Sequence, residues 1–118
     1  MKELGIFLVL ILIWTAVQVF LKLGMDEFAG KQVNVRFFLK ALSSWPVLVG
    51  FFLAVVGSLI WMVVLSRFDL GYSNLVVSLT FVFVALASVV FFKEQISLLR
   101  WVGAGLIVLG VFLVAQAR

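Results

Sequence analysis

The chain of 118 residues contains no cysteine and no histidine, and it has one proline and five acidic residues. Without cysteine it can form neither disulfides nor thiolate nucleophiles, and without histidine it lacks the commonest general base and metal ligand. Soft-metal sites are excluded for the same reason. We therefore expect no metal, no cofactor and no enzymatic chemistry.

Apolar residues make up most of the chain. Hydrophobic residues make up 66% of the chain and charged residues 12%, against about 45–50% and about 25% in ordinary soluble domains. Apolar runs of about 20 residues, long enough to cross a bilayer, cover residues 4–24, 46–65, 71–92 and 98–117. The sequence predicts an all-α integral membrane protein with four transmembrane helices in a single domain, residues 1–118.

The connections between these runs differ in length. Residues 66–70 and 93–97 form short links, which predict antiparallel neighbouring helices. The first connection is longer, and its segment 34–42 places Arg36 and Lys40 one turn apart beside apolar residues. This pattern predicts a short interfacial helix, with an irregular loop as the alternative. We expect no soluble domain and no cleaved signal peptide.

The net charge of +4 is modest, and the basic residues lie near the ends of the apolar runs. This placement suits anionic lipid headgroups rather than nucleic acid. One side of the membrane would collect Lys2, Arg67 and Arg118, and the other would collect Lys22, Lys31, Arg36, Lys40, Lys93 and Arg100. The positive-inside rule places the richer side in the cytoplasm, and a dual topology stays open as the alternative.

No acidic residue lies in the middle of an apolar run. The acids are Glu3, Asp26, Glu27, Asp69 and Glu94, all at or beyond the ends of the runs. Intramembrane carboxylates are the usual mark of proton-coupled transport. Their absence from the middle disfavours a proton-coupled antiporter.

The first run carries a polar face. Trp14, Gln18 and Lys22 recur at intervals of four residues, so they share one side of a helix. We expect this face to receive the anionic headgroup of a substrate. The alternative is that Lys22 extends to the membrane surface while Gln18 ties two helices together.

The third run has a stripe of small and polar residues at intervals of three and four. Its members are Gly71, Asn74, Ser78, Phe81, Ala85 and Ser88. Close helix packing requires only small residues, so Asn74 favours a substrate pathway that includes Ser78. The predicted binding residues are thus Trp14, Gln18, Lys22, Asn74 and Ser78.

Glycines in the second and fourth runs predict close helix contacts. Gly50 and Gly57 indicate packing of the second helix, and Gly103, Gly105 and Gly110 indicate a contact of the fourth helix within the chain or with a second copy. Four helices cannot enclose a substrate-sized cavity, so transport implies at least a homodimer or a heterodimer with a related small subunit.

The segment from Phe92 to Val111 resembles the end of an EamA-type repeat of the drug/metabolite transporter superfamily. It combines Glu94 after the third run, the Trp101-x-Gly103 step and a glycine-bearing last helix. The chain length and four runs are similar to those of half-sized members of that superfamily. This resemblance implies a small-multidrug-resistance-like fold.

Within that superfamily, the chain resembles the subunits of the flippase for aminoarabinose linked to undecaprenyl phosphate. Residues 78–82, Ser-Leu-Thr-Phe-Val, are similar to that family's third-helix core, although Thr80 replaces an Asn and Asn74-Leu75 replaces a Tyr-Pro step. Gly71, Trp61 and Lys22 also fit. This resemblance implies flipping of a lipid-linked sugar.

The small multidrug resistance family is the second resemblance, carried by residues 105–111 of the last helix. The essential Glu of that family corresponds to Trp14 here. The resemblance therefore implies the architecture without the cation/proton exchange mechanism.

The sequence as a whole predicts a multi-pass protein of a prokaryotic inner membrane. We expect a flippase for an amphipathic anionic substrate, such as a polyisoprenyl-phosphate sugar or a related lipid phosphate, in contact with membrane lipids. Two alternatives remain open, namely a small-molecule exporter of the same superfamily and a non-transporting scaffold subunit.

Overall fold

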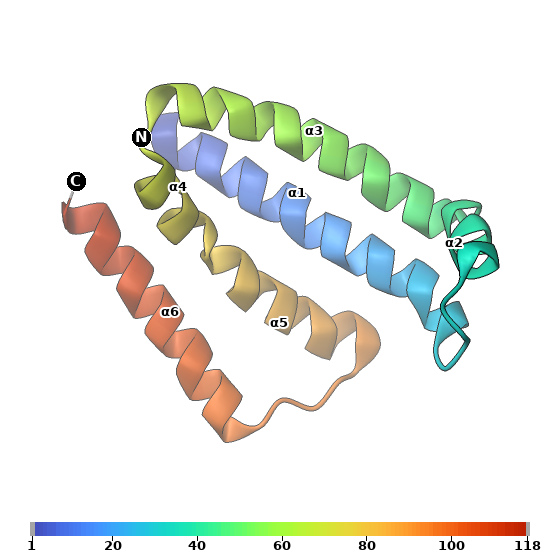
Figure 1. The fold of residues 1–118 in the computed structure, drawn as a ribbon. Coiled ribbons are helices and arrows are strands. Elements are labelled where there is room, and N and C mark those ends of the chain that lie inside the picture. The colour runs from blue at the N-terminus through green and yellow to red at the C-terminus, as the bar shows by residue number, and fades with distance from the viewer. Residues whose placement is uncertain (1, 118) are drawn as a thin grey trace.

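The computed structural model describes residues 2–117 and, for side chains, residues 5–117. Over this range the chain is helical and no strand occurs (Figure 1). The elements are α1 (Lys2–Met25), η1 (Asp26–Phe28), α2 (Val35–Leu42), α3 (Trp45–Arg67), α4 (Leu70–Val77), α5 (Leu79–Phe92) and α6 (Leu98–Ala117). Arg118 and the side chains of Lys2 and Glu3 lie outside the described residues, as does the part of the charge distribution that depends on them.

Four helical stretches are long and apolar enough to cross a membrane. They run Gly5–Phe28, Trp45–Arg67, Leu70–Phe92 and Leu98–Ala117. Most of their large apolar side chains point outward, among them Phe52, Phe81 and Leu98, each more than two-thirds exposed, because lipid is the solvent of such a surface. The predicted all-α fold with four membrane-spanning helices is confirmed, and the chain is a multi-pass membrane protein.

The third span is interrupted at Ser78, between α4 and α5. The Asn74 amide donates to the Leu70 carbonyl at 3.0 Å, and the Ser78 hydroxyl donates to the Leu75 carbonyl. The Phe81 amide bonds the Ser78 carbonyl at 3.0 Å, three residues back. Side-chain bonds to the backbone and tightened three-residue bonds both disturb a regular helix. The span is therefore present as predicted but is not one continuous helix.

The predicted short helix after the first span is confirmed as α2. The Asn34 side chain accepts a hydrogen bond from the Phe37 amide at 2.9 Å and so caps its N-terminus. Ala41 packs into the protein and is 4% exposed, while Val35, Phe38 and Leu39 are exposed. An apolar exposed face beside basic residues is typical of an interfacial helix.

α1 packs most extensively against α3, and next against α5. The glycines of α3 allow α1 and α3 to approach closely. A Cβ on Gly50 would lie 3.0 Å from Leu21 Cδ2, and a Cβ on Gly57 would lie 3.2 Å from Ile13 Cγ2. The predicted packing role of these two glycines is confirmed. Phe7 and Leu10 of α1, Val64 of α3 and Val76 of α4 form the buried core toward the chain termini.

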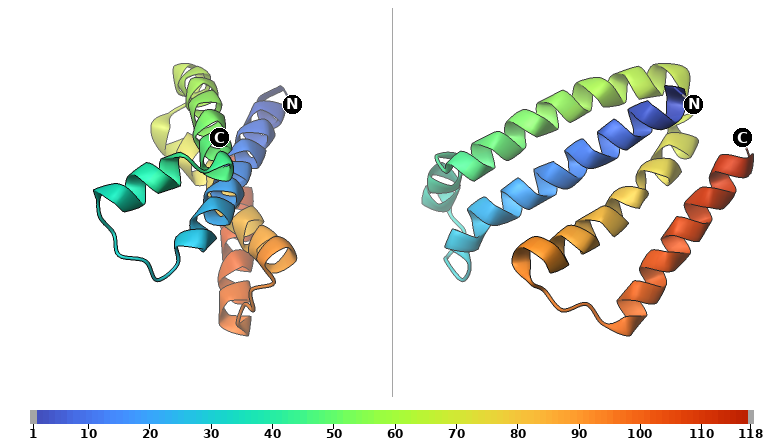
Figure 2. Two further views of the ribbon diagram at one scale, coloured as in Figure 1. Left: turned by 90° about the vertical axis from the view of Figure 1, so that its right-hand side faces the viewer. Right: turned by 180° about the vertical axis from the view of Figure 1, so that it is seen from behind.

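The molecule is flat, with principal extents of 48 × 36 × 21 Å. A thickness of 21 Å corresponds to two helices of about 10–12 Å. The two views of Figure 2 show α1 between α3 and α5, with α6 inclined away at its Leu98 end.

Candidate functional site

A cavity of about 330 Å³ lies between α1, α3 and the interrupted third span. It brings together four of the five predicted binding residues: Trp14, Gln18, Asn74 and Ser78. Its other lining residues are Trp61, Val77, Thr80 and Phe81. We call it the mid-span cavity. No charged side chain lines it, although it has polar groups from both α1 and the third span.

Packing and helical spacing hold these side chains in place. Gly57 lets the Trp14 indole lie against α3, since a Cβ at position 57 would be 3.4 Å from Trp14 Cε2. Gln18 follows one turn later on the same face of α1. The break at Ser78 ends α4 beside the cavity, so Asn74, Ser78 and Thr80 all reach it from a short stretch of chain.

Two side-chain oxygens of residues that line the mid-span cavity have no hydrogen-bond partner within residues 5–117. The side-chain nitrogen of Asn74 donates to the Leu70 carbonyl, and its side-chain oxygen Oδ1 has no partner among the described residues. The buried Thr80 hydroxyl also lacks a partner in this part of the chain. Unsatisfied polar groups inside a membrane protein are costly. The Asn74 side chain is exposed and lines the cavity, so its oxygen is available to accept a hydrogen bond from a polar guest.

Lys22 lines a second, smaller cavity of about 190 Å³, which we call the Lys22 cavity. Gln18 lines both cavities, and Ser88 and Glu94 face Lys22 from α5 and the link after it. Lys22 also forms an exposed ion pair with Asp26, with Nζ 3.0 Å from Oδ1. The predicted face of Trp14, Gln18 and Lys22 thus lines two adjoining cavities. The cavity beside Trp14 has no charged lining residue, and the cavity beside Lys22 has charged ones.

The sequence-based prediction of the site omitted Trp61, Thr80, Phe81 and Glu94, which line these cavities. Phe81 belongs to the predicted stripe and Thr80 borders it, so the spacing of both residues carried a signal. The spacing of Trp61 on α3 indicated packing, and the link containing Glu94 has no periodicity to place it. Their contribution depends on how the helices pack together.

The glycines of α6 have no close neighbours. A Cβ at Gly103, Gly105 or Gly110 would meet nothing within 4 Å. The within-chain contact, one of the two alternatives for these glycines, is therefore not formed. A contact with a second copy stays a prediction.

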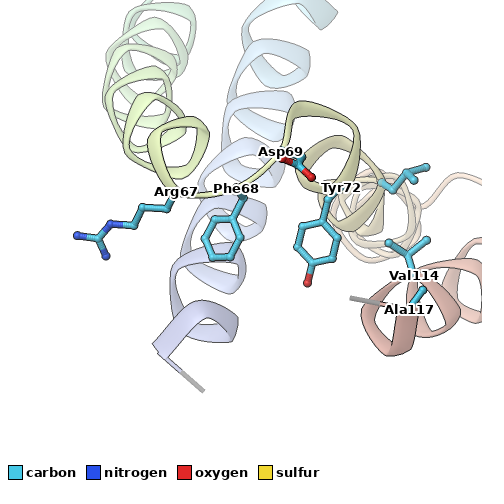
Figure 3. A pocket seen from close by; sticks show the side chains of 7 residues that line it. Arg67, Phe68, Asp69, Tyr72, Val114 and Ala117 are labelled. Carbon is cyan, nitrogen blue, oxygen red and sulfur yellow. The ribbon is translucent and has the colours of Figure 1, made fainter.

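A larger cavity, of about 570 Å³, lies at the turn between α3 and α4 near the C-terminal end of α6. Figure 3 shows the rings of Phe68 and Tyr72 side by side, with Arg67 directed away from them. The two rings are stacked with centroids 6.0 Å apart, and Asp69, Leu75, Val114 and Ala117 complete the lining. None of the predicted site residues lines this cavity.

No group of three or more potential metal-ligating residues (His, Cys, Asp or Glu) occurs among the described residues. The polar groups of the mid-span cavity are amides and hydroxyls, with indole rings beside them. These groups bind a guest through hydrogen bonds and ring contacts.

Comparison with known proteins gives the family. The model of the family described as "Putative transmembrane family 234" matches residues 7–115. The chain belongs to this family. The match includes every predicted binding residue of this family 234 member and both cavities that they line.

Curated relatives carry flippase names. The "Probable 4-amino-4-deoxy-L-arabinose-phosphoundecaprenol flippase subunit ArnE" of Pseudomonas fluorescens is 36% identical over 77 residues, 65% of this chain and 67% of the relative. The ArnE subunit of Pseudomonas syringae is 40% identical over 62 residues, 51% of this chain and 57% of the relative. The ArnF subunit of Proteus mirabilis is 30% identical over 113 residues, 89% of this chain and 85% of the relative.

The matches to these ArnE subunits span about half to two thirds of their length, whereas the ArnF match covers most of both chains. They confirm the predicted resemblance to half-sized flippase subunits, which are transport proteins rather than enzymes. No solved structure matches the chain of this family 234 member.

Proposed function

We propose that this protein is a flippase subunit of a prokaryotic inner membrane. Its substrate is an amphipathic anionic lipid, either a polyisoprenyl-phosphate sugar or a related lipid phosphate. The headgroup crosses the bilayer through the mid-span and Lys22 cavities while the lipid tail stays in the membrane.

The observation that supports this proposal best is the mid-span cavity, which gathers Trp14, Gln18, Asn74 and Ser78. Amides and hydroxyls offer the donors and acceptors that sugar hydroxyls require, and the flat indole of Trp14 offers an apolar surface to a sugar ring. Lys22, in the adjoining cavity that Glu94 also lines, supplies a cation for the phosphate. A headgroup with a neutral part and an anionic part matches this division of charge.

The flatness of the fold favours a dimer. A protein about two helices thick cannot surround its cavities with helices on every side. A second copy, or a related small subunit, would close them. The open face at Gly103, Gly105 and Gly110 gives such a partner a place for close backbone approach.

The relatives give independent support. Their printed names describe subunits of a flippase for an undecaprenol-linked phosphate sugar, which is the class of substrate proposed here. The word "subunit" in those names agrees with a protein that acts with a partner.

The test is lipid translocation by purified protein in vesicles, with a labelled polyprenyl-phosphate sugar and with a related small subunit added where needed. Gln18→Leu and Asn74→Leu should abolish most of the movement, because each removes an amide from the mid-span cavity. Gln95→Leu makes the same chemical change on the exposed link outside both cavities, and it should leave movement intact.

The other outcomes discriminate between the alternatives. Efflux of a water-soluble compound without lipid movement would establish the exporter. Stable assembly with a transporter, but no movement that depends on Gln18 or Asn74, would establish the scaffold subunit.

A further inference from the structure

The connection between α1 and α3 encloses a separate cavity of about 190 Å³, which we call the basic cavity. Lys31, Arg36 and Lys40 line it, together with the amide side chains of Gln32 and Asn34. It shares no lining residue with the mid-span or Lys22 cavity. It therefore does not belong to the groove proposed above for the headgroup.

The charge of the basic cavity is of one sign. No carboxylate lines it, and among the described residues no acidic group lies within ion-pair distance of Lys31, Arg36 or Lys40. The nearby Asp26 is paired with Lys22 instead, at 3.0 Å. Three cations around one small space repel each other, and an anion in that space would turn the repulsion into attraction.

The basic cavity has a fixed apolar floor. The rings of Phe28 and Phe37 contact edge to face with centroids 5.5 Å apart, and Phe28 is buried. The Lys31 ammonium lies over the Phe28 ring, 5.2 Å from its centroid, a cation–π distance. The cap of Asn34 on the Phe37 amide holds the start of α2 against this floor.

α2 places the basic cavity at headgroup depth. Its exposed apolar residues, Val35, Phe38 and Leu39, are 75%, 56% and 63% exposed and share one side of the helix. Arg36 and Lys40 share another side, one turn apart, and line the cavity. A helix with its apolar side in the acyl chains holds its basic side among the lipid phosphates.

We propose that the basic cavity binds the phosphate group of a membrane lipid. The Arg36 guanidinium is suited to a two-pronged contact with phosphate oxygens, while Lys31 and Lys40 act as point charges on either side of it. The Gln32 amide provides a further donor. The bound lipid would fix α2 and the connection to the membrane surface.

Binding to the whole protein in an uncharged detergent tests this site. The probes are short-chain phosphatidylglycerol, phosphatidylcholine of the same chain length, a short-chain polyprenyl phosphate and inorganic phosphate. The triple variant Lys31→Gln, Arg36→Gln, Lys40→Gln should bind the preferred anionic lipid at least about tenfold more weakly, because it loses three charge-assisted contacts.

Two matched variants serve as controls. Arg67→Gln, Lys93→Gln, Arg100→Gln removes the same total charge from positions outside the basic cavity and should retain binding. Lys31→Arg, Arg36→Lys, Lys40→Arg keeps every charge in place and should also retain binding. Helix content by circular dichroism checks that all three variants fold.

The lipid probes identify the source of the phosphate. Preference for phosphatidylglycerol would assign a bulk anionic phospholipid, and preference for polyprenyl phosphate would assign the lipid-linked substrate; both support the site. Equal loss of binding in the two charge-removing variants, unchanged binding in the cavity variant, or inorganic phosphate bound as tightly as lipid would overturn it. Translocation by the unmodified protein is a separate measurement, so failure here leaves the proposed function standing.

Discussion

Gly57 of α3 lies directly against the indole of Trp14 of α1. A Cβ at position 57 would be 3.4 Å from Trp14 Cε2 and 3.5 Å from Trp14 Cζ2. The absence of a side chain on one helix therefore sets the position of a ring that lines the mid-span cavity on another. Packing and binding are coupled at this contact.

Gly57→Leu should destabilise the protein by about 1–3 kcal/mol, the usual cost of overfilling a packed contact. It should also reduce lipid translocation, because the Trp14 ring must move to admit the new side chain. Thermal unfolding in detergent and translocation in vesicles measure the two effects. Gly5→Leu is the control, since a Cβ at Gly5 meets nothing within 4 Å. Equal losses in both variants would contradict this coupling.

Lys22 carries the second prediction. Lys22→Met keeps the apolar stem and removes the charge, whereas Lys22→Arg keeps the charge. The Met variant should insert normally but bind a labelled polyprenyl-phosphate sugar at least about tenfold more weakly, and the Arg variant should retain much of the binding. If Lys22 only extends to the membrane surface, the Met variant will bind as well as the unmodified protein.

Asp26→Asn tests the role of Lys22 by removing its ion-pair partner. The Lys22–Asp26 pair is about half exposed on both side chains, so removing the carboxylate frees the ammonium without burying a charge. Binding of an anionic headgroup should stay equal or become tighter. A loss of binding as large as that of Lys22→Met would show that the ion pair itself, rather than the cation, is required.

The face of α6 gives a prediction on assembly. Gly110→Leu should shift the detergent-solubilised protein toward monomer, because a bulky side chain blocks close approach of a second helix. Cross-linking and light scattering measure this shift. Gly71→Leu also adds a side chain in open space, on α4, and should leave the oligomeric state unchanged. A strictly monomeric unmodified protein would argue against the dimer.

Lys93 holds a left-handed backbone conformation, with φ of 54°, after the last turn of α5. A residue with a Cβ pays about 1–2 kcal/mol there, and glycine does not. Lys93→Gly should therefore raise the unfolding temperature in detergent. Gln95→Gly, two residues later and without a positive φ, should lower it or leave it unchanged. A lower unfolding temperature for Lys93→Gly would contradict this account.

Hydropathy and periodicity predicted the four spans and α2 because lipid imposes both length and apolar character on a span. The glycines of α3 were likewise predictable as packing positions. The break at Ser78 was not, since it depends on which backbone carbonyls the Asn74 and Ser78 side chains bond. The hydrogen-bond partners of these side chains depend on local backbone geometry, which residue spacing alone does not predict.

The candidate site was also predictable only in part. Trp14, Gln18, Asn74 and Ser78 meet in one cavity, as helical spacing within each span suggested. Lys22 lines a different cavity with α5, and that arrangement depends on how α5 packs against α1, which no single span encodes. The place of Glu94 beside Lys22 depends on the same packing.

The central place of α1 has a consequence for biogenesis. Within this chain the ribosome makes α1 before α3 and α5, the helices that pack most extensively against it. Each later helix can thus dock on one already in the bilayer, and α6, made last, packs chiefly on α4 and α5. Until α3 arrives, Gln18 stands in lipid with no neighbouring helix from this chain. The order of synthesis therefore leaves the polar face of α1 without its packing partners until the second and third spans have been made.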